Sequence, residues 1–207
     1  MKVAVAKSLL NSHSYTKYRK IISILLLDGK ATGNNQSEDL THYSQLNEKR
    51  MNRLDKTIMI PEENIMKLLK IRKEFIWLVI SEGWCGDSAQ ILPVLNKMAI
   101  ISPAIELRVV FRDENESLMN MFLTHGSRSI PKVILVDSLT KEVYGSWGPR
   151  PAGAMNLISS YIAQYGSLDE TAKTELQLWY LHDKGLSTQS EILALMENLE
   201  QKNPRTS

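Results

Sequence analysis

Residues 75–93 read FIWLVISEGWCGDSAQILP, and this stretch decides how the rest of the chain is interpreted. Phe75–Ile80 is a short, continuous apolar run, which is typical of a β-strand buried on both faces. Apolar residues then recur at helical spacing, at Ile91, Val94, Leu95 and Met98. The stretch therefore predicts a strand, a short loop and a helix, with Cys85 at the point where the helix begins.

The composition excludes several classes of protein. The chain has 207 residues, one cysteine, 25 Lys and Arg residues and 23 Asp and Glu residues, so its formal net charge is only +2. One cysteine excludes an internal disulfide framework and any zinc or iron–sulfur site that needs several thiolates. The four histidines show no metal-ligand spacing, so we expect no metal site.

The net charge and the length of the apolar runs also limit the partners and the cellular location that we expect. The near balance of charge gives no case for nucleic acid as a partner. No apolar run approaches the ~18 residues that a membrane span needs. Ile21–Leu27, the longest apolar run near the N-terminus, has no small-residue cleavage site of the secretory type after it. We therefore expect a cytoplasmic protein with no nucleic-acid or membrane partner.

Charge divides the chain into three blocks. Residues 1–56 carry a net charge of +5, residues 57–167 carry none, and residues 168–207 carry −3. We expect an N-terminal helical extension at 1–56, a central domain at 57–166 and a C-terminal helical extension at 167–207. The opposite charges would let the two extensions dock on each other, and the extensions could also carry a dimer interface or recognise a partner.

The pattern of apolar residues predicts an α/β fold. Two amphipathic helices are expected in the first block, a helical hairpin in the last, and the order α–β–α–β–α–β–β–α between them. The expected central elements are helices at 61–71, after Cys85, at 114–125 and at 151–165, and strands at 75–80, 105–111, 133–136 and 142–147. The last two strands are joined too tightly for a parallel crossover, so they must be antiparallel. A central mixed sheet flanked by helices follows.

The position of Cys85 at the start of a helix bears on whether its sulfur is a thiol or a thiolate. A helix N-terminus offers unpaired N–H groups and a partial positive charge, and both favour thiolate over thiol. Asp87 brings a negative charge that opposes thiolate formation, and the sequence does not decide which effect is larger. Local capping of the helix is an equal interpretation of Asp87 and Ser88. A small buried hydrophobe is the alternative interpretation of the cysteine itself.

The stretch around Cys85 resembles the active site of the thioredoxin family. Trp84, Cys85 and Gly86 match the first half of the family's W-C-G-P-C motif, and Pro93 matches the proline that kinks its helix. Ile130–Pro131, before an apolar strand, resembles the segment that carries the family's cis-proline. The resemblance covers about residues 57–166 and implies a thioredoxin-like fold.

The resemblance also implies a set of site residues. Cys85 is the expected catalytic residue, and the expected motif and groove residues are Trp84, Gly86, Asp87, Ser88, Ile130 and Pro131. Two N-terminal segments, Thr32–Gln36 and Arg50–Lys56, resemble a narrower subgroup of thioredoxin-like proteins that have an N-terminal helical region.

Three departures from the family pattern bear on mechanism. Ser88 stands where the family has its second cysteine, and Asp87 stands where it has proline. Val79 stands where the family carries a buried carboxylate that serves in proton transfer, and Glu82, which is nearer to Cys85, is expected to be solvated. A serine hydroxyl cannot resolve a mixed disulfide, so the chain cannot by itself reduce a protein disulfide by the two-thiol route.

Three functions remain open. In the first, Cys85 acts as a monothiol oxidoreductase on the mixed disulfide of a protein or peptide, with no cofactor but with a low-molecular-weight thiol as co-substrate. In the second, the protein is a redox-inactive module that binds a partner protein or peptide in the groove beside Cys85 and Pro131. In the third, Cys85 is a regulatory thiol that forms an intermolecular disulfide without turnover. Trp84 and Pro93 favour thioredoxin over the cluster-binding monothiol glutaredoxins.

Overall fold

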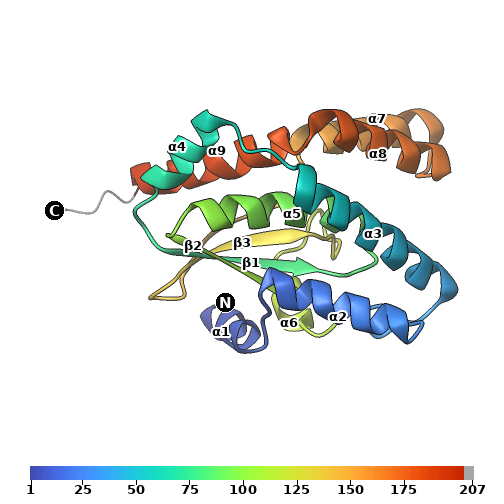
Figure 1. The fold of residues 1–207 in the computed structure, drawn as a ribbon, viewed down its shortest axis with the longest axis horizontal. Helices are drawn as coiled ribbons and strands as arrows, with labels where there is room; N and C mark the ends of the chain where they lie inside the picture. Colours follow the sequence, from blue (N-terminus) through green and yellow to red (C-terminus); the bar gives the residue numbers. More distant parts are fainter. Residues whose placement is uncertain (203–207) are drawn as a thin grey trace.

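The computed structural model describes residues 1–202, so the last five residues of the expected C-terminal extension lie outside the described residues. Its elements, in chain order, are α1 (Lys2–Leu10), α2 (Tyr15–Leu27), α3 (Glu38–Thr57), α4 (Glu62–Lys70), β1 (Phe75–Ser81), α5 (Gly86–Ile101), β2 (Ile105–Phe111), α6 (Glu116–Met119), β3 (Lys132–Asp137), β4 (Val143–Trp147), α7 (Ala152–Tyr165), α8 (Glu170–Asp183) and α9 (Leu186–Lys202). Figure 1 shows their arrangement.

The four strands form one mixed sheet in the order β2-β1-β3-β4. β1 runs parallel to β2 and antiparallel to β3, and β3 runs antiparallel to β4. Trp77 in the middle of β1 lies opposite Leu107 on one side and Leu135 on the other. The predicted mixed sheet and the predicted antiparallel pairing of the last two strands are both confirmed.

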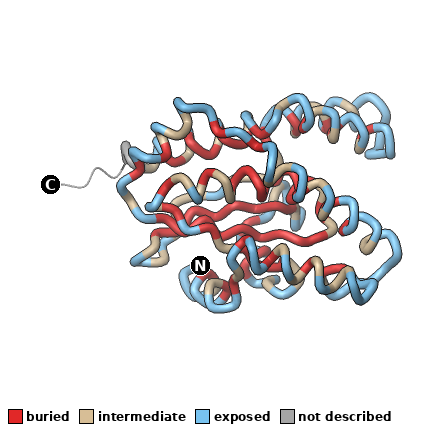
Figure 2. The backbone as a smooth tube through the Cα atoms, in the orientation of Figure 1, coloured by how far each residue is buried: buried red, intermediate tan, exposed pale blue. Residues whose placement is uncertain are grey.

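Strand β1 is buried over its whole length because helices cover both faces of the sheet. Phe75, Trp77 and Val79 point into a core cluster that also contains the apolar residues of α5. The alternate residues Ile76 and Leu78 point into a second cluster, which includes residues of α1 and α6. Figure 2 shows the central strands β1 and β3 as a buried layer between the helices. This arrangement explains why β1 reads as an unbroken apolar run.

The terminal helices pack on the same core as the sheet. Tyr18 and Met51 from α2 and α3, and Leu176 and Tyr180 from α8, all belong to the cluster on the α5 side. In Figure 1, α9 and the α7–α8 pair lie on the same side of the sheet as α5, whereas α1 and α6 lie on the opposite side. The two extensions also meet directly, since Lys173 Nζ donates to Tyr43 Oη over 3.4 Å.

Two helix predictions need correction. The first block contains α1 as well as the two expected helices, and α1 is held by packing of Val5 in the second cluster rather than by a strong pattern of its own. The helix expected over residues 114–125 is only the single turn Glu116–Met119. After it, Thr124 and Ser127 pair through two backbone hydrogen bonds of 2.9 Å around a turn at Gly126, whose φ is +78°.

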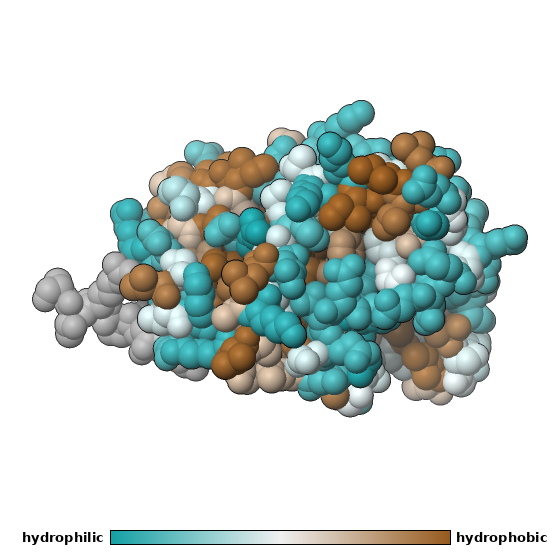
Figure 3. Space-filling model, turned by 90° about the horizontal axis from the view of Figure 1, so that it is seen from below, coloured by the Kyte–Doolittle hydropathy of each residue, from teal (hydrophilic) through white to brown (hydrophobic). Residues whose placement is uncertain are grey.

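The face that carries α1, α2 and α6 is mixed in character. Figure 3 shows several separate hydrophobic groups on it, divided by hydrophilic side chains, rather than one continuous apolar surface. Within residues 1–202, no helix has the length and apolar character that crossing a bilayer requires.

Candidate thiol site

Cys85 lies between the end of β1 and the beginning of α5. It is the N-cap residue of α5, with extended backbone angles (φ −77°, ψ 114°), and its Sγ accepts a hydrogen bond from the Ser88 N–H over 3.4 Å. The Cys85 N–H donates to the Glu82 carbonyl oxygen over 3.2 Å, and this hydrogen bond closes the turn that precedes the helix. The sequence prediction of a cysteine at the start of a helix matches this geometry.

A second segment of the chain reaches the sulfur. The Ile130–Pro131 peptide bond is cis, and the Cys85 thiol donates a hydrogen bond to the Ile130 carbonyl oxygen over 3.3 Å. A second cis bond, Gly148–Pro149, lies against the first, because a Cβ on Gly148 would approach the Pro131 carbonyl oxygen to 2.4 Å. The loops before β3 and after β4 therefore meet beside the cysteine.

The electrostatics of the site hold Cys85 as a thiol. Burial, which leaves the residue only 7% exposed, and to a smaller extent the charge of Asp87 raise the pKa of Cys85 to about 11. Contacts from Ser88 and from the backbone N–H groups of Asp87 and Ser88 lower the pKa of the thiol, but by less. The sequence left this competition undecided. In the structure, burial and Asp87 outweigh the helix N-terminus, so the sulfur keeps its proton at neutral pH.

Asp87 is tied to two elements that the sequence analysis did not connect to the site. Arg150 donates to Asp87 Oδ2 from both Nε (2.8 Å) and Nη2 (2.7 Å). Tyr180 on α8 donates its hydroxyl to Asp87 Oδ1 over 2.9 Å. The C-terminal extension thus contacts the first turn of α5, and the Asp87 charge is offset by a guanidinium. No pattern along the chain marks Arg150 or Tyr180 as members of the site.

Ser88, which the resemblance places at the position of a second cysteine, is 1% exposed. Its hydroxyl is buried and makes no hydrogen bond of normal geometry to any described residue. Val79 is also fully buried among apolar side chains, so no carboxylate lies beneath the site at that position.

The expectation that Glu82 is solvated is wrong. Glu82 is 0% exposed, and the Asp113 N–H donates to its Oε1 over 3.1 Å. Burial, with a smaller contribution from the Asp113 charge, raises the pKa of Glu82 to about 7. The loop expected at Thr32–Gln36 covers this carboxyl group, because a Cβ on Gly33 would lie 3.6 Å from Glu82 Oε2. The distance along the chain between this loop and Glu82 hid the contact from sequence analysis.

Trp84 is half-buried and is held from one side by a cation. The guanidinium of Arg112 lies 4.8 Å from the centre of the Trp84 ring, and Arg112 is itself paired with Asp113 over 2.9 Å. Trp84 therefore keeps a fixed orientation beside Cys85 while part of its surface stays accessible.

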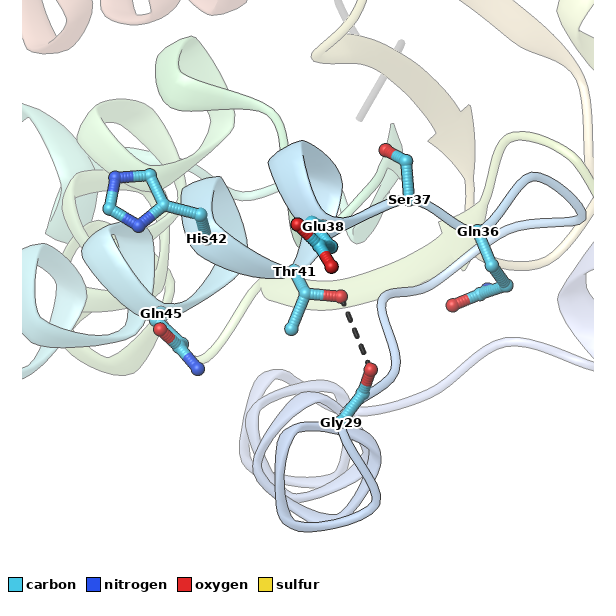
Figure 4. A pocket seen from close by; sticks show the side chains of 7 residues that line it. All are labelled: Gly29, Gln36, Ser37, Glu38, Thr41, His42 and Gln45. Atoms are coloured by element: carbon cyan, nitrogen blue, oxygen red, sulfur yellow. Dashed lines mark hydrogen bonds between the residues drawn. The ribbon is translucent and has the colours of Figure 1, made fainter.

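A shallow pocket lies on another part of the molecule, away from Cys85. It has a volume of about 390 Å³ and lies between the end of α2 and the start of α3. Figure 4 shows Thr41 turned toward Gly29, to whose carbonyl oxygen its hydroxyl donates over 3.3 Å. None of its lining residues belongs to the Cys85 site. Among residues 1–202, no group of three or more His, Cys, Asp and Glu side chains is arranged to hold a metal ion.

The mixed sheet, the cysteine at the start of the helix after β1, and the cis-proline loop against that cysteine define a thioredoxin-like protein. A family model described as thioredoxin matches residues 33–166, which is more than half of the chain. The chain therefore belongs to the thioredoxin family. The match begins inside the N-terminal helical extension expected at 1–56.

Two solved structures share the fold over most of the chain. One is a protein of unknown function from Pseudomonas aeruginosa, which is 19% identical, with a TM-score of 0.59 over 90% of this chain and 98% of that one. The other is an HIV epitope-scaffold, which is 20% identical, with a TM-score of 0.57 over 90% of this chain and 99% of that one. No curated protein matches the sequence. At these identities the likeness establishes the fold alone.

Proposed function

We propose that this thioredoxin-family protein is a binding module, which holds a partner protein or peptide at the surface beside Cys85 and Pro131, with Cys85 as a protonated structural thiol. One observation carries the proposal: Cys85 is only 7% exposed, and its thiol donates a hydrogen bond to the Ile130 carbonyl oxygen. A thiol that is buried and engaged as a donor is a poor nucleophile, because the thiolate is the reactive form. The absence of a second cysteine from the sequence agrees with this role.

Accessible parts of the site supply the surface for such a partner. Trp84 and Gly86 are half-buried rather than covered, and Trp84 is held in place by Arg112. A flat, ordered aromatic ring next to a rigid loop is a common anchor for a peptide. Cys85 then contributes shape and a hydrogen bond rather than reactivity.

The second candidate is the monothiol oxidoreductase, and the hydrogen bond from the Ser88 N–H to the sulfur favours it. A Cys85 thiolate would attack the mixed disulfide of a client, release the client thiol and keep the small thiol as an adduct. A second small thiol would then attack that adduct, which yields a small-molecule disulfide and restores the Cys85 thiol. This route needs no second cysteine in the chain.

One experiment separates the two functions. The wild-type protein and the Cys85→Ser variant are assayed for reduction of a glutathionylated protein, with glutathione as the second thiol. Serine can still donate a hydrogen bond to the Ile130 carbonyl, so the variant is a matched control. The binding proposal predicts equal, background rates for both proteins. Turnover by the wild type that the variant lacks would contradict the proposal and establish the oxidoreductase.

A further inference from the structure

A cavity of about 750 Å³ lies where the N-terminal and C-terminal extensions meet. Its lining comes from the end of α3, the segment that joins α3 to α4, the end of α8 and the start of α9. In Figure 1 the end of α3 lies beside the junction of α8 and α9. We call this cavity the extension pocket, and its apolar lining includes Leu54, Ile58, Ile60, Tyr180, Leu181 and Leu186. Its volume is within the range of ~300–1,000 Å³ that is usual for small-molecule sites.

The inner wall of the extension pocket belongs to the core of the protein. Ile58, Ile60 and Tyr180 are at most 8% exposed, and all three are members of the cluster on the α5 side of the sheet. Gln189 of α9 fixes the segment between α3 and α4, because its Nε2 donates to the Met59 carbonyl oxygen over 3.0 Å. The wall is therefore held in place by contacts within the protein, and the pocket reaches from the surface to the core.

The side chains that line the pocket offer a ligand hydrocarbon and no free hydroxyl proton. Tyr180 donates its hydroxyl to Asp87 Oδ1 over 2.9 Å, and Thr57 Oγ1 donates to the Arg53 carbonyl oxygen over 3.0 Å. A peptide group of a ligand placed against this wall would lose hydrogen bonds to water without replacement from these side chains. The inner part of the pocket therefore suits a hydrocarbon chain better than a peptide backbone.

The charged residues that line the pocket leave a net charge of +1. Arg53 on α3 and Lys184 at the end of α8 are positive, Glu62 at the start of α4 is negative, and all three are exposed, so they lie at the mouth. None of the ion pairs among residues 1–202 includes Arg53 or Lys184. The charges that act on Arg50, one turn earlier on α3, are a repulsive one from Arg53 and an attractive one from Asp87. The mouth is thus suited to an anion.

We propose that the extension pocket binds a small carboxylic acid with a linear apolar chain. The chain lies against the inner wall, where burial of its apolar surface stabilises the complex. The carboxylate stays at the mouth, where it pairs with Arg53 and Lys184. The site goes beyond the proposed function, because its ligand does not touch Cys85 or Pro131 and needs no partner protein.

A titration with three molecules of equal chain length tests the proposal. The full-length protein, labelled with ¹⁵N, is titrated at pH 7 with octanoate, octanamide and octylammonium, each below the concentration at which it forms micelles. The signals followed are the backbone amides of Met59, Leu181 and Leu186. We expect saturable shifts, with octanoate bound about twofold to tenfold more tightly than octanamide and octylammonium bound least tightly, since exposed ion pairs contribute modestly. Equal affinities for the three molecules would overturn the proposal.

Two variants test the charges at the mouth. Arg53→Gln and Lys184→Gly should each weaken octanoate binding by about twofold to fivefold and leave octanamide binding unchanged. Lys184 has a φ of +54° at the end of α8, where glycine is favoured, so Lys184→Gly should not lower the melting temperature. Lys49→Gln, which removes an exposed charge of α3 that does not line the pocket, is the control and should bind octanoate as the wild type does. Unchanged octanoate binding in both charge variants would overturn the proposal.

A third variant tests the position of the chain. Leu181→Trp enlarges a side chain in the pocket lining and should abolish binding of both octanoate and octanamide. Leu178→Trp is its matched control, since Leu178 lies one turn earlier on α8, is 41% exposed against 49% for Leu181, and does not line the pocket. Full octanoate binding by Leu181→Trp would overturn the proposal. So would binding of the peptide acetyl-Leu-Leu-Glu-amide without a response to octanoate, which would assign the pocket to a protein partner.

Discussion

Tyr180 on α8 donates its hydroxyl to Oδ1 of Asp87, two residues after Cys85, over 2.9 Å. The two residues are 93 positions apart in the chain, and the contact joins the C-terminal extension to the first turn of the helix that begins after the thiol. Arg150 holds the other oxygen of the same carboxylate. Asp87 is therefore held by two segments that lie far from it in the chain.

Removal of the Asp87 charge should lower the pKa of Cys85. In Asp87→Asn, the negative charge that helps to raise the pKa of the thiol is gone, while the backbone N–H groups of α5 remain. The variant also leaves Arg150 without its partner, which should lower the free energy of unfolding by about 1–3 kcal/mol. The pH dependence of Cys85 alkylation and urea denaturation measure the two effects. Asp169→Asn is the control, since Asp169 also accepts from a tyrosine, Tyr161, but is exposed and is the N-cap residue of α8, away from Cys85. An unchanged or higher pKa of Cys85 in Asp87→Asn would contradict the account.

The hydroxyl of Tyr180 should contribute measurably to stability. Tyr180→Phe keeps the ring in the core and removes one buried hydrogen bond to a charged group, so a loss of about 1.5–3 kcal/mol in the free energy of unfolding is expected. Tyr161→Phe removes a hydrogen bond of 2.9 Å to Asp169 at an exposed position and should cost much less. Urea denaturation of the two variants compares them directly. Equal losses of unfolding free energy in the two variants would mean that the buried contact with Asp87 stabilises the protein no more than the exposed contact with Asp169.

Glu82 should make stability depend on pH. Its pKa in the folded state is about 7, above the ordinary value of 4.5, so the folded protein binds the proton more tightly than the unfolded chain. This contribution is complete below pH 4.5 and is lost as the pH rises through 7, at a cost on the order of 2–3 kcal/mol. Glu82→Gln resembles the protonated form at every pH, so the wild type should lose more stability than the variant between pH 5 and pH 8. Denaturation curves for both proteins at the two pH values decide this, and parallel losses would show that Glu82 is ionised in the fold.

Gly148 should be less replaceable than other glycines with positive φ. Its φ is +110°, and a Cβ there would meet the Pro131 carbonyl oxygen at 2.4 Å. Gly166 has a φ of +84° and no atom within 4 Å of such a Cβ, so Gly166→Ala should cost only the backbone strain of about 1–2 kcal/mol. Gly148→Ala should cost at least about 1 kcal/mol more, because it adds a steric clash. Thermal denaturation of both variants tests this, and a smaller loss for Gly148→Ala than for Gly166→Ala would contradict the described packing.

Local sequence patterns were sufficient for the strands of the central sheet, although not for the helix expected over residues 114–125. The apolar run at Phe75–Ile80 predicts a strand buried on both faces, and in the structure alternate residues of β1 do enter two separate clusters. The short connection between β3 and β4 predicts their antiparallel pairing. Both inferences depend on neighbours in the chain, and for that reason they could be drawn without a structure.

The rest of the site could not be read from the chain because it depends on distant contacts. The net effect of Asp87 and of the helix N-terminus on the pKa of Cys85 depends on the burial of the thiol. It also depends on Arg150 and Tyr180, which only the folded chain brings near. Glu82 looks like a loop carboxylate, and its burial comes from the segment around Gly33. Helix α1 is missed for the same reason, since its packing on the sheet holds it in place.

The protonation state of Cys85 is the central claim, and the pH dependence of its alkylation rate in the native protein tests it most directly. The account predicts slow alkylation at neutral pH, with a rate that rises through a pKa of about 11. Cys85 is the one cysteine in the sequence, so the signal needs no assignment. An alkylation rate that has already reached its plateau below the ~8.5 of a free thiol would mean that the sulfur is an activated nucleophile, and it would contradict the account.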